Sequence, residues 1–293
     1  KVEEAMRSLG CQMENTVTVS KETQPLIVLN IPGIENAFYQ EIIRGARVSA
    51  KAHGCHLLIH ESHLNKGNML DFCNLLRRVD AAGVILLNRI SEEALNQIRT
   101  IAPLVQCCEY NEHADYPYVS IDDTRAAEIA TEYLLSNGGS KIALINGPGN
   151  FKYAKRRQEG FMNALQKAEV MIPKQWIVQL PEVSYEMAYA AVCRLLNSDS
   201  RPNAFFTISD VFAAAVIRAA KRFHFHVPKD ILVVGFDNIE LSSMTTPSIT
   251  TVNQPKFQMG YTACEMLLEL MEDPHGEMKS LLLDTELVIR EST

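Results

Sequence analysis

The 293-residue chain has no long hydrophobic run and no CxxC pair. Its longest apolar stretches, such as Gly83–Leu87 and Ile231–Phe236, are far shorter than the ~20 residues that cross a bilayer. The seven cysteines are an odd number, and one adjacent pair, Cys107 and Cys108, fits neither a disulfide framework nor a zinc ribbon. These absences argue against a membrane span and favour a reducing, cytoplasmic environment.

Positive charge is not in excess. Lys and Arg number 28 against 35 for Asp and Glu, so the formal net charge is −7. A protein that grips nucleic-acid phosphates over its whole surface carries the opposite sign. If DNA is a partner, the contact belongs to a segment outside this chain.

The common enzyme and metal signatures are also missing. No GxSxG, GxxxxGK[ST] or GxGxxG is present, and the proline in Gly147–Gly149 removes an amide that a phosphate nest needs. Four histidines, His53, His56, His60 and His63, have the spacing of a helical stripe. Because this segment has the pattern of a strand, where only residues two apart share a face, we expect no metal site there.

What is present is the alternation of βαβ units. Apolar residues make up 47% and charged residues 22%, as in ordinary globular proteins. The expected strands are Leu26–Ile31, His56–His60, Gly83–Leu87, Leu104–Cys107, Tyr118–Ile121, Lys141–Ile145, Trp176–Gln179, Ala204–Ile208, Ile231–Phe236 and Leu281–Ile289. The expected helices are Tyr39–Ala52, Leu70–Arg77, Glu92–Ile101, Thr124–Ser136, Ala154–Lys167, Tyr185–Leu196, Val211–Arg222 and Lys256–Met271. Ten strands are too many for one typical sheet, so we predict an α/β fold of two Rossmann-like lobes with parallel sheets, the second beginning near residues 137–140.

Polar residues follow many of the expected strands. They are Asn36–Tyr39, Glu109, Asp122, Ser209–Asp210 and Asp237–Asn238. In open parallel sheets a ligand lies beyond the carboxyl ends of the strands. Two lobes that face each other across such edges would form a cleft of carboxylates, hydroxyls and aromatics, which suits a neutral polyhydroxyl ligand.

The segment Val227–Glu240, followed by Thr246-Pro247 and Thr250–Pro255, resembles the effector-domain signature of the LacI/GalR transcriptional repressors. The resemblance extends from about Pro25 to the carboxyl end, through Asn36–Tyr39, Arg157–Phe161, Ser209–Asp210 and Ile289–Thr293. It implies a type I periplasmic-binding-protein-like fold and a homodimer. Lys1–Gly10 resembles the last helix of the family's DNA-binding headpiece, the rest of which this chain lacks. Operator DNA is therefore the implied partner, contacted through that missing headpiece.

The resemblance divides the chain into three parts. Residues 1–24 would be the end of the headpiece and a linker. Residues 25–138 with 253–275 would form an amino-terminal lobe, and residues 139–252 with 276–293 a carboxy-terminal lobe.

A narrower likeness, to the cytidine-responsive branch of the family, suggests the effector. It rests on Val119–Asp122, Ala220–Arg222, Gly235–Ile239 and Asp284–Arg290. It implies cytidine or a related nucleoside, or else a sugar, as the effector. It also implies the cyclic-AMP receptor protein as a second partner.

The expected ligand-binding residues combine hydroxyl acceptors, donors and stacking rings. They are Phe38, Tyr39, Glu109, Asp122, Arg157, Tyr185, Ser209, Asp237 and Gln254. Asp237 would accept hydroxyl protons and Arg157 would donate from its fork. Each has a structural alternative: the aromatics could be core, Arg157 a solvated helix face, and Asp122, Asp237 and Gln254 caps or hinge residues. Asp210 is expected to be a helix cap.

Two other functional classes remain open. A periplasmic binding protein for a sugar or nucleoside would share the fold and the cleft. A nucleoside hydrolase would need a cluster of aspartates for calcium near the amino end, where this chain has Asn36–Tyr39 instead. We therefore expect no enzyme activity, no cofactor and no metal.

Overall fold

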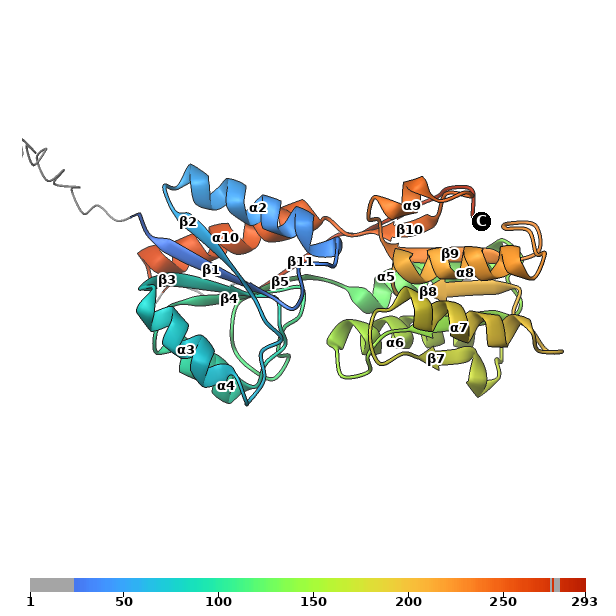
Figure 1. The fold of residues 1–293 in the computed structure, drawn as a ribbon, viewed down its shortest axis with the longest axis horizontal. Coiled ribbons are helices and arrows are strands. Elements are labelled where there is room, and N and C mark those ends of the chain that lie inside the picture. Colours follow the sequence, from blue (N-terminus) through green and yellow to red (C-terminus); the bar gives the residue numbers. More distant parts are fainter. Residues whose placement is uncertain (1–23, 275, 277–279) are drawn as a thin grey trace, which may run out of the picture.

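The computed structural model describes residues 24–274, 276 and 280–293 (Figure 1). The expected headpiece helix over Lys1–Gly10, and the linker up to residue 23, lie outside the described residues. No helix in the described part of the chain is long and apolar enough to cross a membrane.

Strands and helices alternate along most of the chain. The strands are β1 (Leu26–Ile31), β2 (His56–Glu61), β3 (Ala81–Leu86), β4 (Leu104–Cys107), β5 (Tyr118–Ile121), β6 (Ile142–Asn146), β7 (Ile177–Gln179), β8 (Ala204–Thr207), β9 (Leu232–Asp237), β10 (Thr250–Asn253), β11 (Leu281–Leu283) and β12 (Glu286–Val288). The helices are α2 (Phe38–Ala52), α3 (Met69–Arg78), α4 (Glu92–Arg99), α5 (Asp123–Ser136), α6 (Lys152–Lys167), α7 (Tyr185–Leu196), α8 (Asp210–Arg222), α9 (Leu241–Met244) and α10 (Lys256–Glu272).

The strands form two six-stranded sheets, which lie end to end along the long axis of the molecule (Figure 1). The first has the order β11-β5-β4-β3-β1-β2, and its strands are all parallel. The second has the order β12-β10-β9-β8-β6-β7, and only β12 runs antiparallel to its neighbour. The predicted α/β fold with two lobes and two parallel-dominated sheets is therefore confirmed.

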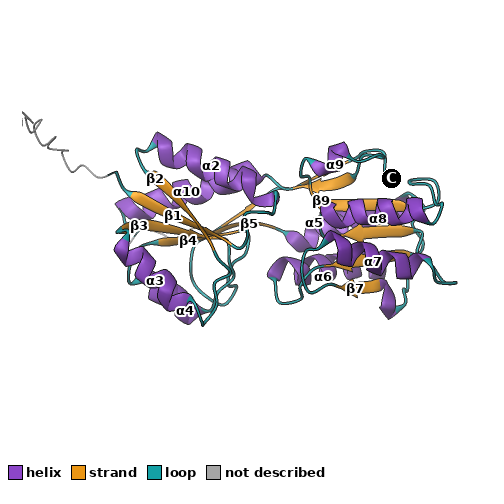
Figure 2. Ribbon diagram, viewed as in Figure 1, coloured by secondary structure: helices purple, strands orange, loops and turns teal. Residues whose placement is uncertain are grey.

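Both faces of the first sheet are covered by helices, as a parallel sheet requires (Figure 2). Alternate residues of β1 show the two sides. Ile27 and Leu29 pack into the core that includes α2 and α10, whereas Val28 packs into the core that includes α3 and α4. All three are fully buried.

In the second lobe, α5 packs along α6 and α7 packs along α8. The first pair approaches very closely at Gly160 on α6. A Cβ atom at that position would lie 2.0 Å from the backbone carbonyl oxygen of Thr124 on α5, so only glycine fits there without a shift of backbone.

The chain returns to the first lobe between β10 and α10, within a few residues of the expected boundary at residue 253, but the first crossing differs from expectation. The expected first boundary after residue 138 is wrong, because α5 already packs on α6, β8 and β9 of the second lobe. The crossing lies between β5 and α5 instead. An amphipathic pattern shows that a helix has an apolar face, but it does not show which sheet that face covers.

The end of the chain also differs from expectation. The single strand expected over Leu281–Ile289, in the second lobe, is two strands in different lobes. β11 pairs with β5 of the first sheet, and β12 pairs with β10 of the second. Two short elements, β10 and α9, were not predicted at all.

Candidate functional site

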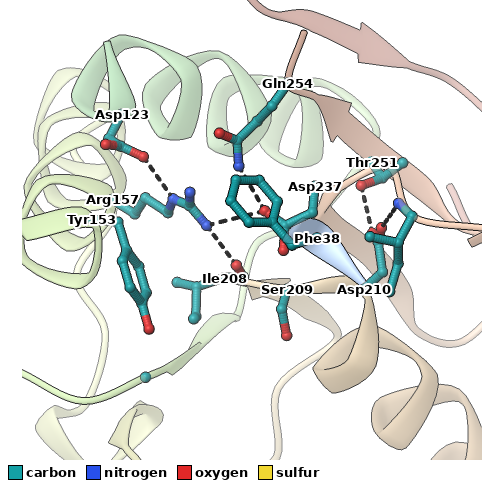
Figure 3. Close-up of polar contacts among 12 residues, drawn as sticks. Phe38, Asp123, Tyr153, Arg157, Ile208, Ser209, Asp210, Asp237, Thr251 and Gln254 are labelled. Carbon is teal, nitrogen blue, oxygen red and sulfur yellow. Dashed lines mark hydrogen bonds and ion pairs between the residues drawn. The ribbon is translucent and has the colours of Figure 1, made fainter. Parts of the chain in front are cut away.

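The carboxyl ends of the strands bring Arg157 between two carboxylates (Figure 3). Arg157 lies on α6, Asp123 is the first residue of α5, and Asp237 ends β9. The Nε atom of Arg157 donates to Oδ1 of Asp123 at 2.9 Å, and Nη1 lies 3.6 Å from Oδ1 of Asp237. Nη1 also donates to the carbonyl oxygen of Ile208 at 2.7 Å, and the guanidinium lies over the ring of Phe236 at 3.6 Å. The arginine is thus buried and fixed from several sides.

Asp123 is a functional candidate that the sequence analysis missed. It also accepts a hydrogen bond from Nζ of buried Lys152 at 2.7 Å. Burial raises the pKa of Asp123, but the positive charges of Arg157 and Lys152 outweigh it and lower the pKa below the usual value. The predicted neighbour, Asp122, is exposed and accepts from the backbone N–H of Arg125 at 2.9 Å, so it caps α5.

Asp237 is held by residues from the crossing that follows β10. Gln254 Nε2 donates to Oδ1 of Asp237 at 2.7 Å, and Lys256 Nζ donates to its main-chain oxygen. Burial raises the pKa of Asp237, against the opposing charges of Arg157 and Lys256. Burial also lowers the pKa of Lys256. The structure therefore brings Arg157, Asp237 and Gln254, three of the predicted residues, into one cluster.

Glu109 joins the two lobes. It follows β4 in the first lobe, and its two carboxylate oxygens accept the backbone N–H groups of Lys152 and Tyr153, each at 3.0 Å, at the beginning of α6. These amides are otherwise unpaired at a helix start, where the helix dipole favours negative charge. Burial raises the pKa of Glu109, while the charge of Lys152 and these two hydrogen bonds oppose the rise.

Phe38 and Tyr39 begin α2, and their rings meet edge to face with centroids 5.4 Å apart. Phe38 is buried and packs in the hydrophobic core, which is the structural role that the sequence also allowed. Burial raises the pKa of the Tyr39 hydroxyl, and charges on Cys108, Tyr153, Glu109 and Asp237 raise it further. Tyr39, in the first lobe, therefore lies near ionisable groups of both lobes.

The two predicted residues near α7 and α8 have different surroundings. Ser209 is buried and caps α8 by accepting from the backbone N–H of Phe212 at 3.3 Å. Tyr185 stacks on Tyr189 with centroids 6.3 Å apart, and no contact joins it to the Arg157 cluster within the described residues.

Asp210 is not the cap of α8 that we expected, since Ser209 takes that place. It accepts from the backbone N–H of Ile239 at 2.8 Å and from Oγ1 of Thr251 at 2.5 Å. Burial, assisted by the charge of Asp237, raises the pKa of Asp210 to about 8.

Comparison with known proteins identifies the family. Residues 131–293 match the model of a periplasmic binding protein-like domain. Over 297 aligned residues the chain is 33% identical to the HTH-type transcriptional repressor CytR of Escherichia coli K12, covering 100% of this chain and 86% of that protein. The chain belongs to the LacI/GalR family of transcriptional repressors.

Solved structures agree with the LacI/GalR assignment. A putative transcriptional regulator LacI from Bacillus cereus subsp. cytotoxis superposes with a TM-score of 0.85 at 26% identity, covering 92% of this chain and 99% of that one. A LacI family transcriptional regulator from Enterococcus faecium with bound ribose has a TM-score of 0.81 at 26% identity, covering 92% and 98%. These relatives are transcriptional regulators rather than enzymes, and their two-lobed fold is the one described above.

Proposed function

We propose that this LacI/GalR chain is the effector-binding and dimerisation part of a transcriptional repressor, and that its interlobe cleft binds cytidine or a related nucleoside. The observation that carries the proposal is the pairing of Arg157 on α6 with Asp237 at the carboxyl end of β9. A carboxylate beside a guanidinium offers acceptors and donors together, which is what a neutral diol requires.

Arg157 and Asp237 each have one polar atom that remains available to a ligand. Oδ2 of Asp237 and Nη2 of Arg157 form no hydrogen bond with any described residue, although the other polar atoms of these side chains do. A ribose cis-diol can donate to Oδ2 and accept from Nη2. Phe38 and Tyr39 supply rings for a base face. The ribose bound to the Enterococcus faecium regulator supports a ligand of this chemistry.

The output of binding would be a change in how the lobes are held together. The contact between Glu109 and the start of α6 is one interlobe link that an effector could strengthen or break. In a homodimer with a headpiece on each chain, such a shift alters the spacing of the two headpieces on operator DNA in the cytoplasm. Allosteric coupling of this kind is typically worth about 1–3 kcal/mol. Cooperation with the cyclic-AMP receptor protein, implied by the narrower family likeness, belongs to the same proposal.

Isothermal titration tests the choice of ligand. The ligands are cytidine, uridine, adenosine, ribose and glucose, each titrated into the same preparation of the chain. We expect heat of binding with a nucleoside. Binding to glucose with no heat from any nucleoside would discard the nucleoside and leave the repressor assignment, which rests on the family, unchanged.

The Asp237→Asn variant tests the site. The backbone φ of Asp237 is +101°, a positive value that asparagine tolerates better than most residues. The amide keeps the shape but loses the charge, so we expect nucleoside binding at least about tenfold weaker. Asp199→Asn, an exposed change in the same lobe, is the matched control. Unchanged affinity in a folded Asp237→Asn variant would remove this residue from the site.

A further inference from the structure

A hollow of about 300 Å³ lies beside α6 and the end of β7, in the second lobe. Its lining includes Asn146, Gln158, Met162 and Gln179, but neither Arg157 nor any residue of the first lobe. The hollow is therefore separate from the interlobe cleft. Its volume is at the lower end of the range found for small-molecule sites.

Three side-chain amides shape the floor of the hollow. Asn146 is buried at the end of β6, and its Nδ2 atom has three acceptors within reach: Oε1 of Gln158 at 3.0 Å, Oε1 of Gln179 at 3.2 Å and the main-chain oxygen of Ala154 at 3.1 Å. Its own Oδ1 accepts from the backbone N–H of Gly147 at 2.9 Å, which fixes the orientation of this amide. The carbonyl ends of both glutamines thus point to Asn146.

The NH₂ ends of these glutamines remain available. Neither Nε2 atom donates a hydrogen bond within the part of the chain that the structure describes. Gln179 is exposed, and Nε2 of the half-buried Gln158 is not among the buried polar atoms without partners. Two amide donors therefore line the hollow and are accessible to solvent. Such a pair suits a ligand that carries oxygen acceptors.

The lining of the hollow carries one cation and one anion, Lys155 and Glu159. The carboxylate of Glu159 lies 2.9 Å from Nη1 of Arg156, a guanidinium that it shares with Glu112. Lys155 forms no ion pair with any described residue, so its ammonium is free to pair with a ligand anion. Ala154 and Met162 add an apolar wall. The surroundings thus combine a positive charge, two amide donors and an apolar surface.

We propose that this hollow is a second ligand site, which takes a small organic carboxylate with an apolar body. The carboxylate accepts from the NH₂ groups of Gln158 and Gln179 close to Lys155, and the apolar body packs on Met162. The site stands independently of the ligand in the cleft. Because α6 also carries Arg157, a carboxylate bound here contacts the helix that supplies the guanidinium of the cleft.

Saturation-transfer NMR on the 293-residue chain tests the proposal, with hexanoate and benzoate as the carboxylates. Benzamide, which has the same shape as benzoate without its charge, is the comparison compound. We expect transfer to at least one carboxylate at millimolar concentration and weaker transfer to benzamide. No transfer to either carboxylate, or equal transfer to benzoate and benzamide, would overturn the proposal.

Variants then locate the binding. Gln179→Leu removes one donor, and Met162→Trp fills the hollow; both side chains are exposed, so the fold should persist. We expect carboxylate binding at least about tenfold weaker in each. Gln97→Leu, an exposed change on α4 in the other lobe, should bind as the parent does.

The Asp237→Asn variant separates the hollow from the cleft. It should bind the ligand of the cleft more weakly, and it should bind the carboxylate as the parent chain does. Loss of carboxylate binding in Asp237→Asn would place the carboxylate in the cleft and refute a second site. Parent-like binding in both Gln179→Leu and Met162→Trp would refute it as well.

Discussion

Arg157 and Asp123 form an ion pair in the interior of the second lobe, with Nε of the arginine 2.9 Å from Oδ1 of the aspartate and both side chains less than a tenth exposed. The pair joins α6 to the first turn of α5 and holds the guanidinium beside Asp237. The same carboxylate also neutralises Lys152. Two buried cations therefore share this anion.

Replacing Asp123 by Ala should destabilise the fold strongly. The change removes the carboxylate that lies nearest to both Arg157 and Lys152, and breaking a buried pair in this way costs about 3–5 kcal/mol. The neighbouring change Asp122→Ala removes only a helix cap, which costs about 0.5–2 kcal/mol. Urea unfolding of the two variants measures the difference in their free energies of unfolding. Equal losses of stability would show that other groups stabilise the two buried cations when Asp123 is absent.

These two aspartates also show how far the sequence could specify the site. Strand ends and family likeness predicted Arg157, Asp237 and Gln254, which the structure brings together. They selected Asp122, whereas the buried carboxylate of the cluster belongs to its neighbour Asp123. The chain leaves the first sheet at this point, and which carboxylate points inward depends on the direction in which α5 starts. That direction is set by packing on the second lobe, which no local pattern encodes.

In the fold, too, local sequence patterns predicted individual strands but not which sheet each strand joins. The apolar runs predicted β1, β4 and β5 with the observed bounds, because each run is buried on both faces. β11 and β12 are three residues each and only partly buried, so their apolar residues predict a strand but not where it divides. Their assignment to different sheets depends on edge pairing with β5 and β10.

Removing the Glu109 carboxylate should loosen the contact between the lobes. In Glu109→Ala the backbone N–H groups of Lys152 and Tyr153 lose a charged acceptor, and hydrogen bonds to charged groups contribute about 1.5–3 kcal/mol. We expect a larger radius of gyration in small-angle X-ray scattering of the ligand-free variant. An unchanged scattering curve would mean that other contacts hold the lobes in place.

Glu112 provides the control for this experiment. It also lies in the loop after β4, and it pairs with Arg156 on α6 at 2.5 Å, but both side chains are partly exposed. Solvent-exposed pairs contribute only about 0–1 kcal/mol. Glu112→Ala should therefore leave the radius of gyration as it is in the parent chain.

Asp210 should make the stability of the protein depend on pH. Its pKa is about 8 in the folded protein, above the value of about 3.9 for an unfolded aspartate, so the folded state holds the proton more tightly. Its contribution to stability is complete below about pH 4. It is lost by up to about 1.4 kcal/mol per pH unit as the pH rises towards 8, and is constant above that.

The Asp210→Asn variant removes this titration. Its free energy of unfolding, measured by urea at several pH values, should fall less steeply between about pH 4 and 8 than that of the parent. Asp199→Asn, which changes an exposed aspartate, should keep the parental slope. If the slopes of Asp210→Asn and the parent coincide, Asp210 is ionised in the folded protein throughout this range.

Because α5 and α6 approach closely at Gly160, replacing this glycine by alanine should destabilise the protein rather than stabilise it. Replacing a helical glycine by alanine ordinarily stabilises a protein by up to about 1 kcal/mol, through the unfolded chain and helix propensity. Here the new Cβ would meet the carbonyl oxygen of Thr124 at 2.0 Å, so the two helices must separate. Overpacking of this kind costs about 1–3 kcal/mol.

We therefore expect Gly160→Ala to unfold at a lower urea concentration than the parent chain. Gly149→Ala is the comparison, because its Cβ would have its nearest contact at 3.5 Å, with Nε2 of Gln179. Since α6 carries Arg157 and its first amides bind Glu109, separating the helices should also weaken effector binding in Gly160→Ala. A stabilised Gly160→Ala variant would show that α5 and α6 have room between them, and the position of Arg157 would then need another cause.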